Sequence, residues 1–203
     1  MATEAEKRAA ERQARLFEIQ TREAPPPDDG GQRELYVEGY AARFNSPTVL
    51  FEFGGAEYKE QIDPHAFDDA DMGDVIMNYN HGGKVVARTR NNTLEVRVDD
   101  VGLYIRARLD GTEEGRRLYD EIRGGYIDRM SFAFTIQEES FDKAALMWTV
   151  RKVKRLYDVA AVDIPAYDDT SIAARRASVE ADQREKQAAL DSAKRKLALK
   201  CKI

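Results

Sequence analysis

The stretch TLEVRVDDVGLYIRARL, residues 93–109, decides the fold. Apolar and polar residues alternate on both sides of the segment DDVG, which has the composition of a turn. Because side chains alternate between the two faces of a strand, each half of the stretch has one apolar face. The pattern predicts a β-hairpin whose apolar faces carry Leu94, Val96, Val98, Leu103, Ile105, Ala107 and Leu109.

Most of the surrounding chain also has the composition of strands. The segment 112–125 is the exception, because it predicts a helix that begins after Thr112 as N-cap and ends at Gly124. We therefore expect a mainly β protein with some α (α+β), in which a small antiparallel β-barrel or sheet is flanked by a few helices. The further predicted strands are 35–44, 57–62, 74–80, the strand that follows residue 128, 145–156 and 157–165.

The two ends of the chain differ in composition from this body. Residues 1–24 predict a helical N-terminal extension with a thin apolar stripe, and the Pro/Gly-rich segment 25–33 predicts a linker. We expect the core at 34–172 and a basic helical tail at 173–203.

Charge and cysteine content narrow the classes of function. Residues 25–172 have a net charge of −10, and the tail at 173–203 has one of +5. An acidic body makes direct nucleic-acid binding unexpected. The one cysteine, Cys201, excludes an internal disulfide, and no apolar run is long enough to cross a bilayer. We therefore expect a soluble protein of a reducing compartment, without membrane association.

The segment DRMSFAF, residues 128–134, predicts a strand with two unlike faces. Phe132 and Phe134 are large, whereas Ser131 and Ala133 on the other face are small. A strand that served only stability would carry Val or Ile on a second buried face, so solvent or another group should lie over the serine. Ser131 is therefore either a packed or solvated serine, or a nucleophile that needs room above it.

A serine hydroxyl becomes a good nucleophile only when a neutral imidazole, itself oriented by a third group, takes its proton. His81 follows a predicted strand and precedes two glycines, so it is either a catalytic base or a polar residue of a loop. His65, in a proline turn, is expected at the surface. Two histidines on unrelated elements do not make a metal site, and the Gly-Gly segments lack the spacing of a nucleotide loop. We expect neither metal nor cofactor.

Six segments in the same order resemble the prohead proteases of tailed bacteriophages, which are capsid-maturation serine peptidases related in fold to herpesvirus assembly proteases. The resemblance extends from about residue 35 to residue 174. The segments are VEGYAARFN (37–45), EQIDPHAFD (60–68), VIMNYNH (75–81), TLEVRVDDVGLYIRARL (93–109), IRGGYIDRMSFAF (122–134) and LYDVAAVDIPAYDDTSI (156–172).

This resemblance implies a catalytic triad. It places the histidine of the family on His81, the nucleophile on Ser131 and the acidic third member on Asp158, where the family more commonly has Glu. Aspartate is one methylene shorter, so the backbone would have to lie closer to the imidazole. Alternatively, Asp163 or a water molecule shares the orienting role.

The resemblance also implies substrates and partners. These are the scaffold protein or domain and the scaffold-like part of the major capsid protein, cleaved together with the protease itself inside the prohead, in the host cytoplasm. Dimerisation follows only by analogy with the herpesvirus enzymes. Two other readings stay open: a scaffold-associated assembly protein of the same fold with weak or no activity, and a binding module in which Ser131 only packs.

Overall fold

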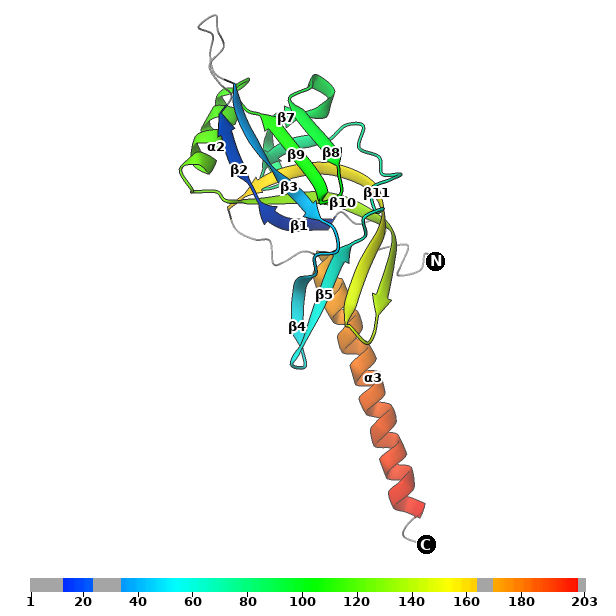
Figure 1. The fold of residues 1–203 in the computed structure, drawn as a ribbon. Coiled ribbons are helices and arrows are strands. Elements are labelled where there is room, and N and C mark those ends of the chain that lie inside the picture. Colours follow the sequence, from blue (N-terminus) through cyan, green and yellow to red (C-terminus); the bar gives the residue numbers. More distant parts are fainter. Residues whose placement is uncertain (1–12, 24–33, 164–169, 201–203) are drawn as a thin grey trace, which may run out of the picture.

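Residues 13–23, 34–163 and 170–200 are described by a computed structural model. They form two β-sheets packed around one core, together with helix α2 (Glu113–Arg123), helix α3 (Thr170–Lys200) and a 3-10 turn at Thr89–Asn91. In Figure 1, α2 lies against the body formed by the sheets, whereas α3 extends away from it. Within the described residues, no helix is long and apolar enough to cross a membrane.

The larger sheet has seven strands and the smaller one has four. The order in the larger sheet is β1 (Gln13–Glu18), β10 (Arg129–Asp142), β11 (Met147–Val162), β5 (Ala56–Ile62) and β4 (Thr48–Phe53), with β6 (Ile76–Tyr79) paired to β11 and β7 (Gly82–Arg88) paired to β6. The order in the smaller sheet is β2 (Gln20–Glu23), β3 (Leu35–Arg43), β9 (Gly102–Arg108) and β8 (Leu94–Val98).

The long antiparallel pair β10 and β11 connects the two ends of the larger sheet. One edge of β11 pairs with β5 near Met147–Val150 and with β6 near Asp158–Ala161, and both of these pairings are parallel. Register shifts between residues 133 and 139 of β10 interrupt its ladder with β11. Because such bulges bend a strand pair, the pair curves from the main body into an arm shared with β4 and β5 (Figure 1).

The core lies between the two sheets and beneath α2. The large face of β10 is fully buried there, as its alternation predicts. Thr112 caps α2 by accepting a hydrogen bond from the amide of Gly115, which confirms the predicted start of this helix. The predicted hairpin is also confirmed, because β8 and β9 pair from Leu94 opposite Ala107 to Val98 opposite Leu103.

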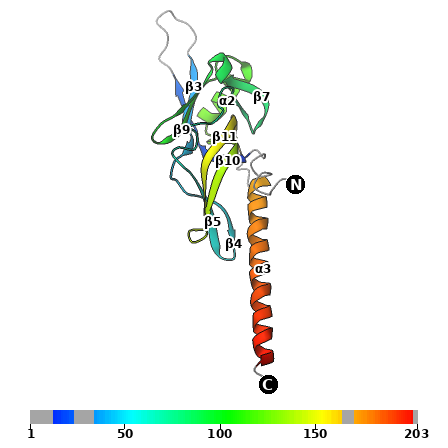
Figure 2. The ribbon, with the colours of Figure 1, turned by 90° about the vertical axis from the view of Figure 1, so that its right-hand side faces the viewer.

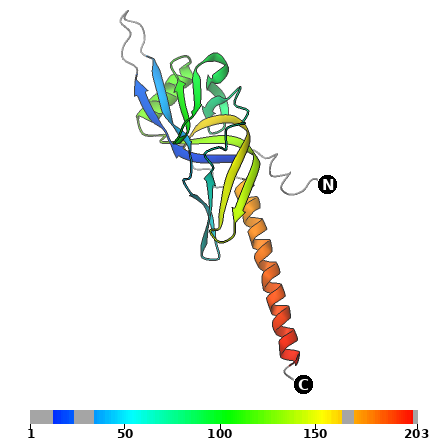
Figure 3. The ribbon, with the colours of Figure 1, turned by 45° about the vertical axis from the view of Figure 1, so that its right-hand side comes forward.

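The prediction of a helix in residues 1–24 is wrong for the part that the structure describes. Residues 13–18 and 20–23 are β1 and β2, which pair with β10 and β3 (Figure 3, blue). Ile19, buried between them, marks the point where the chain passes from one sheet to the other. Tertiary pairing thus overrides the helix propensity of a segment rich in Ala, Glu and Arg.

Several boundaries also differ from the predicted ones. The folded body includes residues 13–23, so it begins before the predicted start at 34. Residues 1–12 and the whole predicted linker at 25–33 lie outside the described residues. The predicted strands 145–156 and 157–165 are the single strand β11, and β4 and β7 were not predicted. The mainly antiparallel α+β class is confirmed, with two sheets that do not close into a barrel in the described part of the chain.

Helix α3 is attached to the arm by one buried arginine. The side chain of Arg175 is 1% exposed and donates hydrogen bonds to Glu60 and Glu139, while its guanidinium lies 5.0 Å from the ring centroid of Trp148. Further along, Gln183 Nε2 donates to the Tyr58 hydroxyl at 3.5 Å. Figure 2 shows the rest of the helix continuing beyond the strands.

Candidate active site

His81 lies in a tight turn between β6 and β7. Tyr79 pairs with Gly82, so the loop consists only of Asn80 and His81, whose φ angles are 49° and 55°. Two successive residues with positive φ define the type I′ turn that suits a two-residue hairpin. Asn and His adopt positive φ more often than most other non-glycine residues do, but such angles are uncommon outside glycine and recur at functional positions.

The end of β11 holds this turn in place. The Asn80 side chain donates to Asp163 Oδ1 at 2.9 Å, and the Asp163 amide donates back to Asn80 Oδ1 at 3.3 Å. The Tyr79 hydroxyl donates to Asp163 Oδ2 at 2.5 Å, and this hydrogen bond, followed by burial, raises the pKa of Tyr79. Asp163 therefore orients the turn that carries His81.

Asp158 contacts the imidazole itself. Its Oδ1 lies 2.5 Å from His81 Nδ1, and the two side chains are 2% and 24% exposed, respectively. Asp158 lies on β11 between Ala133 of β10 and Ile76 of β6. A carboxylate at this position holds the proton on Nδ1 and leaves the lone pair on Nε2. His81 Nε2 is buried and has no hydrogen-bond partner within the described residues, so it is available to accept a proton.

Ser131 lies on the same face of the sheet, one strand away. It pairs with Ala160 of β11, which in turn pairs with Asn78 of β6. Directly paired residues share a face, and so do residues two apart on one strand, so Ser131 and Asp158 point to the same side. Since His81 reaches Asp158 on that side, its imidazole also lies over the face that carries the serine.

Small side chains on this face make room for the imidazole. Ala160 is flanked by Ser131 and Asn78 across the sheet and follows Asp158 by two residues on β11. A methyl group here, and another at Ala133, leave space that a β-branched side chain would fill. The strand face of small side chains that was noted in the sequence, with Ser131 and Ala133, therefore lies beside the Asp158 carboxylate that His81 contacts.

Sequence reasoning missed two other residues of this face. Ala160 carries no polar group that would attract notice, and Asn78 was seen only as part of a strand. Asn78 is buried, and its Oδ1 has no hydrogen-bond partner in the part of the chain that the structure describes. The pairing of β6 with β11 brings it here, and that pairing joins segments about 80 residues apart. His65, by contrast, lies at the surface beside Asp68, as predicted.

A buried carboxylate on an imidazole, with a serine on the adjoining strand, is the type of site that serine hydrolases use. Residues 18–185 match the family of caudovirus prohead serine proteases, and the chain therefore belongs to that family. The matched region contains His81, Ser131 and Asp158 as well as nearly all of both sheets. It begins at residue 18, which agrees with the early start of the folded body.

Other comparisons add less. Among solved structures, the bacteriophage T4 capsid assembly protease gp21 is similar, with a TM-score of 0.46 and 16% identity over 73% of this chain and 98% of that chain. No curated protein matches the sequence. Family membership therefore follows from the sequence match over residues 18–185.

Proposed function

We propose that the protein is a serine endopeptidase of the prohead-maturation type, in which Ser131 is the nucleophile, His81 the general acid and base, and Asp158 the residue that orients the imidazole. One observation carries the proposal. His81 Nδ1 lies 2.5 Å from Oδ1 of the buried Asp158, Asp158 shares its face of the sheet with Ser131, and the buried His81 Nε2 has no hydrogen-bond partner among the described residues. This is the arrangement that converts a hydroxyl into a nucleophile.

The reaction then has two stages. Ser131 Oγ forms a bond to the peptide carbonyl carbon as His81 Nε2 takes the hydroxyl proton, and the imidazolium delivers that proton to the leaving amine when the C–N bond breaks. In the second stage, water forms a bond to the acyl carbon and gives a proton to the same nitrogen, which returns it to Ser131 Oγ as the ester C–O bond breaks and the new carboxyl end of the peptide leaves. Asp158 stays ionised and stabilises the imidazolium in both stages.

The aspartate in place of the more common glutamate does not favour the inactive alternative. Asp158 already reaches the imidazole at 2.5 Å, because β11 runs directly beside β6, the strand that leads into the His81 turn. The shorter side chain is therefore long enough to reach the imidazole from this strand. The assembly-protein reading would gain support only if the site proved chemically inert.

The proposed substrates are the scaffold protein or domain, the scaffold-like segment of the major capsid protein and the protease itself, cleaved in the assembling prohead within the host cytoplasm. Membership of the prohead protease family supports this proposal. Residues 13–23 belong to the sheets, so we assign the role of tether to the scaffold to α3. A truncation after Arg176 should retain the Arg175 attachment yet reduce packaging of the enzyme into proheads.

A fluorophosphonate probe tests the nucleophile without knowledge of the cleavage site. The probe should label wild-type protein at one serine, identified by peptide mass mapping as Ser131, and should not label Ser131→Ala. Ser140→Ala is the matched control, because Ser140 lies on the same strand, where it accepts a hydrogen bond from Arg151. Asp158→Asn should slow labelling by about 10³–10⁴-fold, because the amide favours the wrong tautomer. Equal labelling of all four proteins would refute the triad.

Co-expression with the capsid and scaffold proteins tests the substrates. Intact-mass spectra should show shortened capsid and scaffold chains with the wild-type protein and full-length chains with Ser131→Ala. If the probe labels Ser131 but both chains keep their full mass, the protein is a serine hydrolase with other substrates.

A further inference from the structure

Asn78 is a buried polar residue of β6 to which the catalytic steps proposed above give no role. It is 4% exposed, and its Oδ1 has no hydrogen-bond partner within the described residues. A buried strand position beside a small residue such as Ala160 is usually filled by an apolar, β-branched side chain. An unpartnered carbonyl group there lowers stability, so packing alone does not explain the asparagine.

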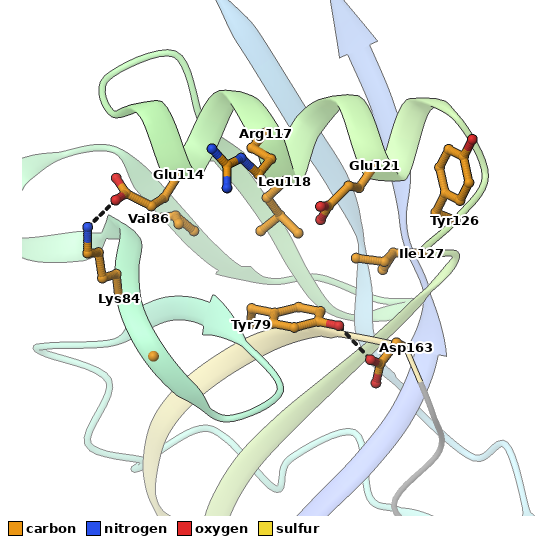
Figure 4. A pocket seen from close by; sticks show the side chains of 11 residues that line it. Tyr79, Lys84, Val86, Glu114, Arg117, Leu118, Glu121, Tyr126, Ile127 and Asp163 are labelled. Carbon is orange, nitrogen blue, oxygen red and sulfur yellow. Dashed lines mark hydrogen bonds and ion pairs between the residues drawn. The ribbon is translucent and has the colours of Figure 1, made fainter.

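Alternation along β6 directs Asn78 to the face of the sheet that carries Ser131. Figure 4 shows the next residue, Tyr79, lining the pocket between the hairpin and α2, where its hydroxyl donates to Asp163. Neighbouring residues of a strand point to opposite faces, so Asn78 points away from that pocket. Across the sheet, Asn78 pairs with Ala160, which pairs with Ser131, so all three lie on one face.

The imidazole of His81 lies over the same part of this face. On β6, Ile76 lies beside Asp158, and Asn78 follows two residues nearer the turn. His81 Nδ1 lies 2.5 Å from Asp158 Oδ1, so the side chain extends from the turn back toward Ile76. That path crosses the position of Asn78, and the imidazole and the amide of Asn78 are therefore neighbours.

The ring and the carbonyl group attract each other only after a proton has been transferred. In the resting site, His81 Nε2 and Asn78 Oδ1 are both acceptors without a partner in the part of the chain that the structure describes. When His81 takes the proton of Ser131, the ring becomes positively charged. The oxygen is the negative end of the amide dipole, and in a buried site it attracts this charge more strongly than it would in water.

We propose that Asn78 is a positioning residue of the active site, whose side-chain carbonyl stabilises the imidazolium form of His81. The inference rests on the proposed peptidase function. Because the attraction acts on the imidazolium of the transition state and not on the neutral ring, it accelerates the attack by Ser131. It also explains why an unpartnered oxygen is retained beside the ring.

Fluorophosphonate labelling of Asn78→Leu across a range of pH tests the proposal, because leucine has nearly the same shape as asparagine but no dipole. At pH values where His81 is neutral, Ser131 should be labelled about tenfold more slowly than in wild-type protein, a smaller effect than the loss of an oxyanion donor. At acid pH the two rates should converge, because the resting protein then already contains the imidazolium. The midpoint of the pH profile should therefore fall by about one pH unit.

Urea unfolding and a matched control separate this role from a structural one. Leucine removes a buried unpartnered carbonyl group, so Asn78→Leu should unfold at a higher urea concentration than wild-type protein. Met77→Leu is the control, because Met77 precedes Asn78 on β6, is fully buried on the opposite face and changes little in volume. Its labelling rate should match that of wild-type protein at every pH.

Two results would overturn the proposal. One is a labelling rate of Asn78→Leu that is lower by the same factor at every pH, together with unfolding at a lower urea concentration, as expected of a structural residue. The other is an unchanged labelling rate. The charged groups around His81 are the same in all of these proteins, so the differences report residue 78 alone. They include Asp158, which contacts the ring, Asp163, which binds the turn, Lys84, which pairs with Glu114, and Arg129, which pairs with Asp128.

An NMR titration separates this inference from the peptidase function. The chain has two histidines, and His65 lies at the surface, so their imidazole C–H signals can be followed in Ser131→Ala protein, where no reaction occurs. Adding Asn78→Leu should move the titration of the His81 signal to lower pH and leave that of His65 in place. This shift without labelling of wild-type protein at Ser131 would refute the proposed function and retain the role of Asn78. Labelling of Ser131 without the shift would refute the role of Asn78 alone.

Discussion

The two ends of the β10–β11 pair differ in whether their buried polar groups have hydrogen-bond partners. At the end near Ser131, the side chains are small, and His81 Nε2 and Asn78 Oδ1 are buried without hydrogen-bond partners among the described residues. At the arm end, Phe51, Tyr58 and Trp148 pack together, and the buried Arg175 binds carboxylates.

The free-energy cost of burying a polar atom without a partner explains this difference between the two ends. A buried polar atom without a partner costs about 1–3 kcal/mol, so a protein keeps such atoms where a ligand or a reaction needs them. A buried charge with well-placed partners serves to fix one arrangement of the chain. The same strand pair therefore carries the proposed catalytic site at one end and the attachment of α3 at the other.

The largest expected effect is on the free energy of unfolding, when the buried arginine that attaches α3 to the arm is replaced. Arg175→Met removes the cation opposite Glu60, whose side chain is 3% exposed, so the free energy of unfolding should fall by about 3–5 kcal/mol. Urea unfolding measures the change, and adding Glu60→Gln should recover part of it. Arg176→Met is the control, because Arg176 is 54% exposed in its pair with Glu180 and should contribute about 0.5 kcal/mol or less.

The same variants test whether the two ends are independent. Below the temperature at which Arg175→Met unfolds, its rate of fluorophosphonate labelling at Ser131 should match that of wild-type protein. If Arg175→Met and Arg176→Met unfold alike, the buried ion pairs do not fix α3. If the labelling rate falls in folded Arg175→Met protein, the end of the strand pair near Ser131 and the end that binds α3 are not independent.

The parts of the fold that the sequence predicts are those with local signals. The hairpin at 93–109 contains its own turn, and α2 contains its own cap, so both were found. The strands β1 and β2 were mistaken for a helix because only their pairing with β10 and β3 makes them strands. In β7, the initial Gly-Gly weakened the strand signal.

In the candidate site too, residues with a local sequence signal were predicted, whereas those placed only by long-range pairing were missed. His81, Ser131 and Asp158 were named from a glycine-flanked histidine, a sparse strand face and a family resemblance. The antiparallel pairing of β10 with β11 places Ser131 and Asp158 on one face, and the parallel pairing of β6 with β11, together with the hydrogen bonds of Asp163 to the turn, brings His81 to Asp158. The contacts of β6 and of the turn with β11 link residues about 80 positions apart, and no local pattern encodes them. Asn78 was missed for that reason, and Ala160 was missed because it has no polar group.

The second largest effect is expected from substitutions on the two faces of β11. Ala160 and Ala161 are adjacent and fully buried, but they face opposite sides of the sheet. Ala160→Val should displace the imidazole, and a shift of about 1 Å costs about 100-fold in rate. Ala161→Val should instead overpack the core, lowering the free energy of unfolding by about 1–3 kcal/mol with little change in the reaction rate of the folded protein.

Labelling rates and urea unfolding of both variants distinguish the two faces. The expected result is a crossed pattern, in which one alanine governs mainly rate and its neighbour mainly stability. If Ala160→Val labels as fast as wild-type protein, the imidazole does not lie over Ala160, and the geometry proposed for the nucleophile and base fails.

The smallest effect is a pH dependence at the turn that holds His81. The hydrogen bond to Asp163 raises the pKa of Tyr79, so the folded state favours the neutral phenol. Its contribution to stability is complete below the ordinary tyrosine pKa of about 10 and is lost as pH rises through the higher value of the folded state. Alkaline pH should therefore loosen the turn.

Ultraviolet titration of tyrosinate measures this shift. The difference between wild-type protein and Tyr79→Phe isolates one of nine tyrosines, and its midpoint should lie above the ordinary value. Asp163→Asn should lower that midpoint, because the amide accepts a hydrogen bond but lacks the negative charge that opposes ionisation. If the midpoint is the same in the Asp163→Asn variant as in the wild-type protein, Asp163 does not hold the turn in solution, and the orientation of His81 then depends on Asp158 alone.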